Sequence, residues 1–190
     1  MENNYNNITS PEELLKFMSG NIEYGYLGRN NHIYKENDPN FDKDWLDEYI
    51  LENASDVLKT KIGNCWDQVE LERDWFKKNN YEFKTIYHQV LLDYDNPYPT
   101  HTFLVYKKDN KYYWFENAWE NMRGIHEFNS IEELLEFEYK ENIKMLKNYN
   151  ILEEEIKKIK YCEYDEPVSH ISAMEFVESK FKNKELIIKR

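Results

Sequence analysis

The sequence is poor in cysteine and in basic residues. Its 190 residues include only two cysteines, Cys65 and Cys162, which are too few for a disulfide framework. Lys and Arg number 25 against 37 Asp and Glu, for a net charge of -12, so nucleic acids and anionic membranes are not expected as partners. No apolar run approaches a transmembrane span, and the first residues do not resemble a signal peptide. These absences predict a reduced, cytoplasmic protein.

Aromatic residues, in contrast, are plentiful. They make up 16% of the chain and include 16 tyrosines, so the chain is not expected to be disordered despite its charge. A chain of this length can bury a sizeable core. It contains no internal repeat and no linker. We therefore expect a single domain over residues 1–190, with its core at about 45–130 and helical additions at both ends.

Local signals place helices at both ends of the chain and strands between them. Capping boxes, each a serine followed three residues later by a glutamate, predict helix starts at Ser10, Ser130 and Ser172. Asp109-Asn110 predicts a hairpin between two strands. Helices, then an antiparallel sheet of about four strands, then helices again indicate the α+β class. The expected helices are at about 11–18, 45–51, 55–62, 65–79, 130–148, 153–158 and 172–181, the strands at 81–92, 100–107, 111–119 and 159–164, and the loops at 20–40 (with a short strand) and 93–99.

The most informative stretch begins at Gly63. This glycine is expected to close one helix as a left-handed cap, and Cys65 then stands in the first turn of the next helix. Apolar residues such as Val69 and Leu71 fall on different faces of that helix, which is therefore expected to be covered on two sides. Free N–H groups and the positive end of the helix dipole favour a thiolate at such a position. Cys65 is therefore a candidate nucleophile.

A nucleophilic cysteine needs a base and a third group that orients the base. His101, which opens a strand just after a proline-rich loop, is the leading candidate for the base. A two-residue turn at Asp109-Asn110 pairs residues whose numbers sum to 219, which places Glu116 on the face of His101, roughly 7–8 Å away diagonally. A three-residue turn would select Asn117 instead. We predict a triad of Cys65, His101 and Glu116, with Asn117 as the alternative third member.

Three segments together resemble the transglutaminase-like superfamily of papain-like cysteine enzymes. They are Gly-Asn-Cys-Trp at 63–66, Thr-His-Thr-Phe-Leu-Val at 100–105 and Phe-Glu-Asn-Ala-Trp at 115–119. In that family a Gly-x-Cys-Trp helix start precedes a histidine strand and then a strand with an acidic residue, usually aspartate, shortly before a small residue. The resemblance covers about residues 55–120. The chain departs from the family pattern in two ways: it has glutamate at 116 in place of the usual aspartate, and it has no glutamine a few residues before the cysteine, as papain has.

This resemblance implies a fold and an activity. The fold is a cysteine-bearing helix packed on an antiparallel sheet. The activity is thiol-dependent acyl chemistry on the amides of a protein or peptide, carried out by a cysteine protease, amidase or deamidase, or by a transglutaminase. The small size of the chain favours hydrolysis.

The remaining site residues are predicted from the needs of acyl transfer. An oxyanion hole requires donors aimed at the developing negative charge. The backbone N–H of Cys65 is one expected donor, and the side chain of Gln89 or His88 is the second. The side chains expected to line the cleft are Trp66, Asp67 and Trp119.

Two other functions compete with this prediction. An inactive relative could use the cleft only to bind a protein, and a zinc hydrolase could use Cys65, His101 and Glu116 as ligands. The chain has no close ligand pair such as Cys-x-x-Cys, so we expect neither a metal nor another cofactor. Free cysteines are most often small buried residues, and Cys162 is expected in the core. The acidic runs at 132–138 and 153–155 are expected to be exposed helix faces.

Overall fold

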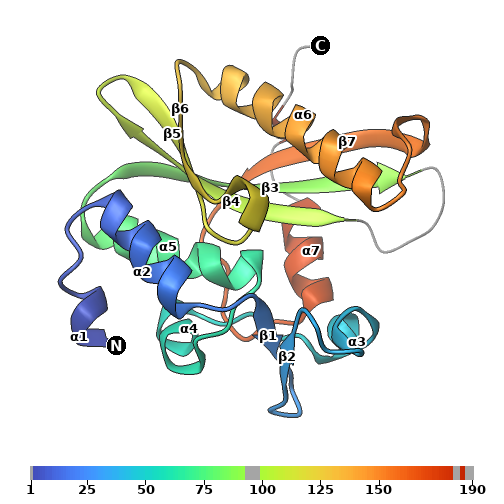
Figure 1. Ribbon diagram of the computed structural model, residues 1–190, viewed down its shortest axis with the longest axis horizontal. Coiled ribbons are helices and arrows are strands. Elements are labelled where there is room, and N and C mark those ends of the chain that lie inside the picture. The colour runs from blue at the N-terminus through green and yellow to red at the C-terminus, as the bar shows by residue number, and fades with distance from the viewer. Residues whose placement is uncertain (1, 93–98, 182–184, 187–190) are drawn as a thin grey trace.

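The computed structural model describes residues 2–92, 99–181 and 185–186. Its helices are α1 (Glu2–Tyr5), α2 (Pro11–Asn21), α3 (Phe41–Glu48), α4 (Ala54–Thr60), α5 (Cys65–Lys78), α6 (Ile131–Asn148) and α7 (Ala173–Phe181), with short 3-10 turns at Glu120–Met122 and Glu153–Glu155. Its strands are β1 (Gly25–Leu27), β2 (Ile33–Lys35), β3 (Glu82–Leu92), β4 (Thr100–Lys108), β5 (Lys111–Glu116), β6 (Gly124–Phe128), β7 (Ile156–Tyr164) and β8 (Glu185–Leu186). In Figure 1 the large sheet separates α6, on one face, from α2, α5 and α7 on the other. The expected α+β class is confirmed.

The large sheet has more strands than expected. Within the described residues it contains six, all antiparallel, in the order β6-β5-β4-β3-β7-β8, while β1 and β2 form a separate hairpin. Strands β3, β4, β5 and β7 correspond to the four that were predicted. Strand β6 begins at a glycine shortly after a 3-10 turn, and β8 has only two residues. Neither segment has an alternation of polar and apolar residues long enough to predict a strand from the sequence.

Several predicted boundaries are wrong. The helix expected at 45–51 runs over Phe41–Glu48, because the chain becomes extended at Tyr49. The strand expected to reach residue 119 ends at Glu116. The helical extension expected at 153–158 is one 3-10 turn, after which β7 begins. Most of the loop expected at 93–99 lies outside the described residues.

The hairpin between β4 and β5 has the predicted register. Asp109 and Asn110 have φ values of 50° and 61°, as a two-residue turn of this hairpin type requires. The paired residues, from Lys108 with Lys111 to Leu104 with Phe115, have numbers that sum to 219. The face on which each side chain of β5 lies follows from this register.

Helix α5 is buried on two sides, as its pattern predicts. Leu71 and Trp75 pack in a core cluster with α2 and β4, whereas Trp66 and Val69 pack in a second cluster with α7. A third cluster fills the space between α6 and the opposite face of the sheet. The start of α5 is therefore held between the sheet and the N- and C-terminal parts of the chain.

Gly63 has a role different from the one predicted. The left-handed cap of α4 is Lys61, with φ of 62°, and none of the described glycines has a positive φ. A β-carbon at Gly63 would lie 3.0 Å from Cβ of Asp67 and 3.3 Å from Cγ of Gln68. A glycine is needed here because the chain passes close to the first turn of α5.

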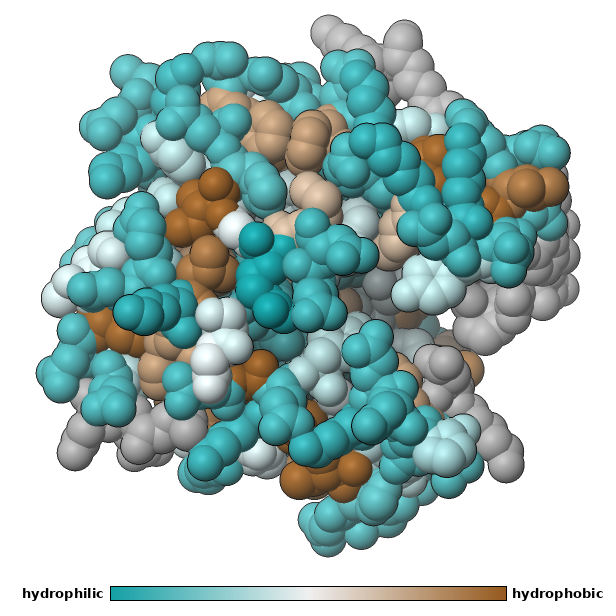
Figure 2. All heavy atoms as spheres, in the orientation of Figure 1, coloured by the Kyte–Doolittle hydropathy of each residue, from teal (hydrophilic) through white to brown (hydrophobic). Residues whose placement is uncertain are grey.

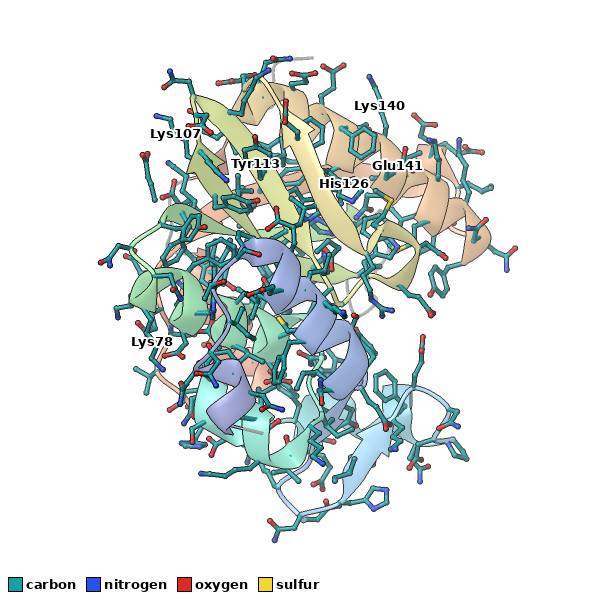
Figure 3. All side chains as sticks on the ribbon, turned by 60° about the vertical axis from the view of Figure 1, so that its left-hand side comes forward. Lys78, Lys107, Tyr113, His126, Lys140 and Glu141 are labelled. Atoms are coloured by element: carbon teal, nitrogen blue, oxygen red, sulfur yellow. The ribbon has the colours of Figure 1, made fainter. Side chains whose placement is uncertain are left out.

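Helix α6 has one buried and one exposed face. Its outer face carries charged residues such as Lys140, which is exposed, and Glu141, which is partly exposed (Figure 3). Glu138, expected in an exposed acidic run, is instead fully buried because it lies on the inward face of the helix. Charged and polar residues cover most of the face shown in Figure 2, with separated apolar areas between them. No described helix combines the length and the apolar composition needed to cross a membrane.

Candidate active site

Cys65 is the first residue of α5, and its position is fixed by a reciprocal cap. Oδ1 of Asn64 accepts hydrogen bonds from the backbone N–H groups of Trp66 (2.8 Å) and Asp67 (3.3 Å). Oδ2 of Asp67 accepts one from the Asn64 N–H (3.0 Å). The Asn64 side chain thus caps the N–H groups that follow Cys65, and the thiol stands at the positive end of the helix dipole.

His101 and Glu116 form a buried pair. His101 Nε2 lies 2.7 Å from Glu116 Oε2, so the predicted contact between the two side chains is confirmed. The carboxylate also accepts hydrogen bonds from Trp114 Nε1 (3.2 Å) and from the Trp119 backbone N–H (2.7 Å). Three donors hold Glu116 in place, and His101 Nδ1 is left as the ring nitrogen available to the thiol.

Asn117 points away from the histidine, as the register predicts. Its Nδ2 donates to Oε1 of Gln68 (2.7 Å), and its backbone oxygen accepts from Nε of Arg123 (3.0 Å). Gln68 Nε2 in turn donates to the Gly63 carbonyl (2.8 Å). Asn117 therefore ties the end of β5 to the start of α5. Gln68, one helical turn after Cys65, is a site residue that was not predicted.

The thiol meets His101 where strand pairing stops. Along β4, His101 lies on the face that packs on α6, while Thr102 lies on the α5 face and its hydroxyl donates to the Cys65 carbonyl (2.8 Å). Pairing between β4 and β5 ends at Leu104 and Phe115, so β5 does not extend alongside the beginning of β4. At this end of the sheet the Cys65 side chain is within hydrogen-bonding reach of the His101 ring.

The charged form of His101 is favoured by its two neighbours. Burial alone would lower the pKa of His101, but the Glu116 carboxylate and the Cys65 side chain outweigh burial and raise this pKa well above its usual value. The ring, placed between the Cys65 side chain and the Glu116 carboxylate, can thus carry a proton at neutral pH. Such a pair supplies a nucleophile and a proton donor at one place.

Two of the three residues expected to line a cleft do not do so. Trp66 is fully buried and stacks on Phe176 at a ring-centroid distance of 4.2 Å. Asp67 is also fully buried, because its carboxylate caps α5. Only Trp119 is partly exposed beside the site, with its ring centroid 5.8 Å from that of His101.

His88, one of the two predicted oxyanion donors, is held on the α6 side of the sheet. It pairs with His101 across β3 and β4, but its Nδ1 lies 2.9 Å from Glu138 Oε1 and its Nε2 lies 2.8 Å from Asn142 Nδ2. The Tyr161 hydroxyl donates to the same Glu138 carboxylate. Both ring nitrogens are therefore directed at α6, and the prediction of His88 as a donor to substrate is wrong.

Gln89, the other predicted donor, lies on the opposite face of β3. It pairs with Thr100 of β4 and shares its face with Tyr87, which packs in the cluster that contains Cys65. Its side chain is buried, and its Oε1 has no hydrogen-bond partner among the described residues. Gln89 is thus on the correct side of the sheet for the predicted role.

Two buried carboxyl groups near the start of α5 make stability depend on pH. Burial raises the pKa of Asp67 to about 7, although Tyr49 and other donors bind it. Burial, and then the charge of Asp67, raise the pKa of Glu52 to about 8. Between their unfolded pKa values, near 4, and these folded values, the folded protein binds more protons than the unfolded chain, so stability falls as pH rises. The folded pKa of His101 is also raised, so the stability that His101 contributes is likewise lost as pH rises through that folded pKa.

We therefore expect the free energy of unfolding, measured with urea, to fall between pH 5 and pH 8. Glu52→Gln should flatten this fall, because a neutral side chain does not have to lose a proton in a buried position. Glu132→Gln, which alters an exposed glutamate of α6, should leave the pH dependence as in the unaltered protein. An unchanged slope in Glu52→Gln would contradict the assignment.

No geometry in the described part of the chain favours the zinc alternative. None of its groups of His, Cys, Asp and Glu side chains brings three or more together to hold a metal ion. His101 and Glu116 bond directly to each other and do not surround a common point. The three predicted side chains are therefore arranged in a row, with the His101 ring between the Cys65 thiol and the Glu116 carboxylate; we call this row the relay.

The thiol, ring and carboxylate form one continuous series of contacts. The thiol stands at a helix terminus, the ring is buried between two groups that favour its charged form, and the carboxylate is fixed by three donors. This order of groups suits nucleophilic attack followed by protonation of a leaving group. No protein-family model matches the sequence, and no curated protein matches it either.

Proposed function

We propose that this protein is a thiol-dependent acyl-transfer enzyme that acts on amide bonds of a protein or peptide, as the resemblance to the transglutaminase-like superfamily implies. The observation that carries the proposal is the position of His101, with Nε2 2.7 Å from the buried Glu116 carboxylate and the rest of the ring reaching Cys65. In this proposal Cys65 is the nucleophile, His101 is the acid and base, and Glu116 orients the ring.

The reaction proceeds in two steps. The Cys65 thiolate attacks the amide carbonyl carbon, a carbon–sulfur bond forms, and the carbonyl electrons move onto oxygen. When these electrons return, the carbon–nitrogen bond breaks, His101 gives its proton to the leaving amine, and a thioester remains. Water, or a second amine, then attacks the thioester while His101 takes up its proton, and the thiolate leaves.

The small size of the chain favours water over an amine as the acceptor. Incubation with casein and monodansylcadaverine distinguishes the two. Formation of the thioester releases an amine or ammonia in both cases, but only transamidation attaches the fluorescent amine to casein. The two cysteines are both free, which fits a reducing, cytoplasmic environment.

The thiol itself provides the first test. We expect iodoacetamide to alkylate Cys65 at least ~10-fold faster than Cys162 at pH 6.5, because an imidazolium stabilises a thiolate at a helix start. Cys162 is buried and its Sγ lies 3.7 Å from the Lys180 carbonyl oxygen. Mass spectrometry of the labelled peptides gives both rates.

His101→Ala should remove this difference, whereas His126→Ala should keep it. His126 lies on β6 (Figure 3), where its ring is hydrogen-bonded to the Met122 carbonyl oxygen and not to the thiol. Equal rates for the two cysteines of the unaltered protein would support the alternative function, an inactive module that binds a protein partner.

A further inference from the structure

A segment near the N-terminus runs directly beside the turn that presents Cys65. The Glu23 N–H donates to the Lys61 carbonyl (2.9 Å), and the Gly63 N–H donates to the Glu23 carbonyl (3.1 Å). These bonds form a parallel bridge between Glu23 and Ile62. Tyr24, the next residue, is therefore fixed alongside the residues that lead into α5.

The side chain of Tyr24 is directed toward the molecule. The Glu23 side chain is exposed and pairs with Lys35, whereas Tyr24 stands at a bend between this bridge and the start of β1. The Tyr24 ring lies 6.2 Å from the ring of Phe41 between centroids. Phe41 packs against the cluster that contains Cys65, and Tyr24 remains partly exposed. The Tyr24 ring thus lies at the edge of the cluster that contains Cys65.

The charges around the phenol agree with this position. Burial, and then the negative charge of Cys65, raise the pKa of Tyr24 well above its usual value, and Glu36, Glu116 and Asp67 act in the same direction. The hydroxyl therefore keeps its proton over the whole working pH range. A protonated phenol close to a thiolate is a hydrogen-bond donor placed where negative charge develops.

The proposed reaction lacks one assigned group, the second oxyanion donor. The backbone N–H of Cys65 supplies one donor, because the Asn64 side chain caps the N–H groups of Trp66 and Asp67. His88 is held by α6, as described above. We infer that the Tyr24 hydroxyl is the second oxyanion-hole donor, binding the carbonyl oxygen of an acyl substrate at Cys65. This inference rests on the proposed function.

Binding of an aldehyde at Cys65 tests the proposed oxyanion hole without turnover. The Cys65 thiolate attacks the aldehyde carbon, a carbon–sulfur bond forms, and the carbonyl π electrons move to oxygen, which takes the proton of the His101 imidazolium to give a hemithioacetal. Before and after protonation, this oxygen occupies the position of the oxyanion. Iodoacetamide, in contrast, loses iodide from a saturated carbon and needs no oxyanion donor.

The test compares N-acetyl-phenylalaninal binding with iodoacetamide alkylation in Tyr24→Phe. Loss of one hydrogen bond to the neutral hemithioacetal oxygen should weaken aldehyde binding about 3–10-fold, while the rate of Cys65 alkylation and the unfolding temperature stay as in the unaltered protein. Tyr113→Phe makes the same chemical change on β5 (Figure 3), where the hydroxyl donates to Glu127 of β6. It should bind the aldehyde normally.

Gln89→Leu tests the rival donor, and the combined results separate the possibilities. Weak aldehyde binding in Tyr24→Phe, with normal binding in Gln89→Leu, supports Tyr24. Normal binding in Tyr24→Phe, or a loss in Gln89→Leu alone, overturns the assignment to Tyr24 and leaves the proposed enzyme intact. If the unaltered protein shows neither aldehyde binding nor preferential alkylation of Cys65, the proposed function fails, and the role of Tyr24 fails with it.

Discussion

Cys65→Ala is expected to abolish acyl transfer, with at least a ~10³-fold loss of turnover, and to leave the fold intact. The substitution removes the sulfur that reaches His101, and no hydroxyl or thiol replaces it as a nucleophile. Cys65 is 6% exposed, so loss of one buried atom should cost about 1 kcal/mol of stability. Release of nitrophenolate from 4-nitrophenyl acetate measures turnover, and thermal unfolding measures stability.

Cys162→Ala is the matched control for this prediction. It removes a buried sulfur of the same kind from β7, where Cys162 is 2% exposed. The two variants should lose similar amounts of stability, but only Cys65→Ala should lose activity. If Cys65→Ala kept its turnover, or if both variants lost it together with the folded state, Cys65 would be an ordinary core residue.

Features that depend on neighbouring residues in the sequence could be predicted well. The Asp109-Asn110 turn sets the register of β4 and β5 by itself, so the contact between His101 and Glu116 followed from counting residues. The serine at 130 starts α6 as expected, since its side chain accepts from the Glu133 N–H. In these cases the cause of the structure lies within a few residues of its effect.

Features that depend on contacts between segments distant in the sequence could not be predicted from local sequence patterns. Asp67 has the sequence position of a surface capping residue, but Tyr49 and the Glu52 N–H cover it from a segment far from α5 in the sequence. Glu138 belongs to an acidic run and is buried only because His88 of β3 faces it. The parallel bridge between Glu23 and Ile62, which places Tyr24 beside the residues that lead into α5, has no local sequence signal.

The two competing assignments for the third catalytic group lead to different expected kinetics. Glu116→Gln should lower turnover about 10²–10³-fold, because an amide cannot stabilise the imidazolium as a carboxylate does. The amide also presents an NH₂ group in place of one carboxylate oxygen, so the donors that now bind Glu116 from His101, Trp114 and Trp119 cannot all be accepted. Asn117→Ala should have a much smaller effect on the chemical step, since Asn117 contacts Gln68 and not the histidine.

The pH dependence gives a readout that a general loss of structure would not produce. Because the Glu116 carboxylate raises the pKa of His101 against the effect of burial, its neutralisation should lower this pKa. Protonation of the leaving amine requires the imidazolium, so the rate of amide cleavage falls as pH rises through the pKa of His101. The alkaline limb of the pH–rate profile should therefore move to lower pH in Glu116→Gln. Glu141→Gln, which alters a partly exposed glutamate of α6 that pairs with Lys144 (Figure 3), should leave the limb in place. An unmoved limb in Glu116→Gln would remove Glu116 from the relay.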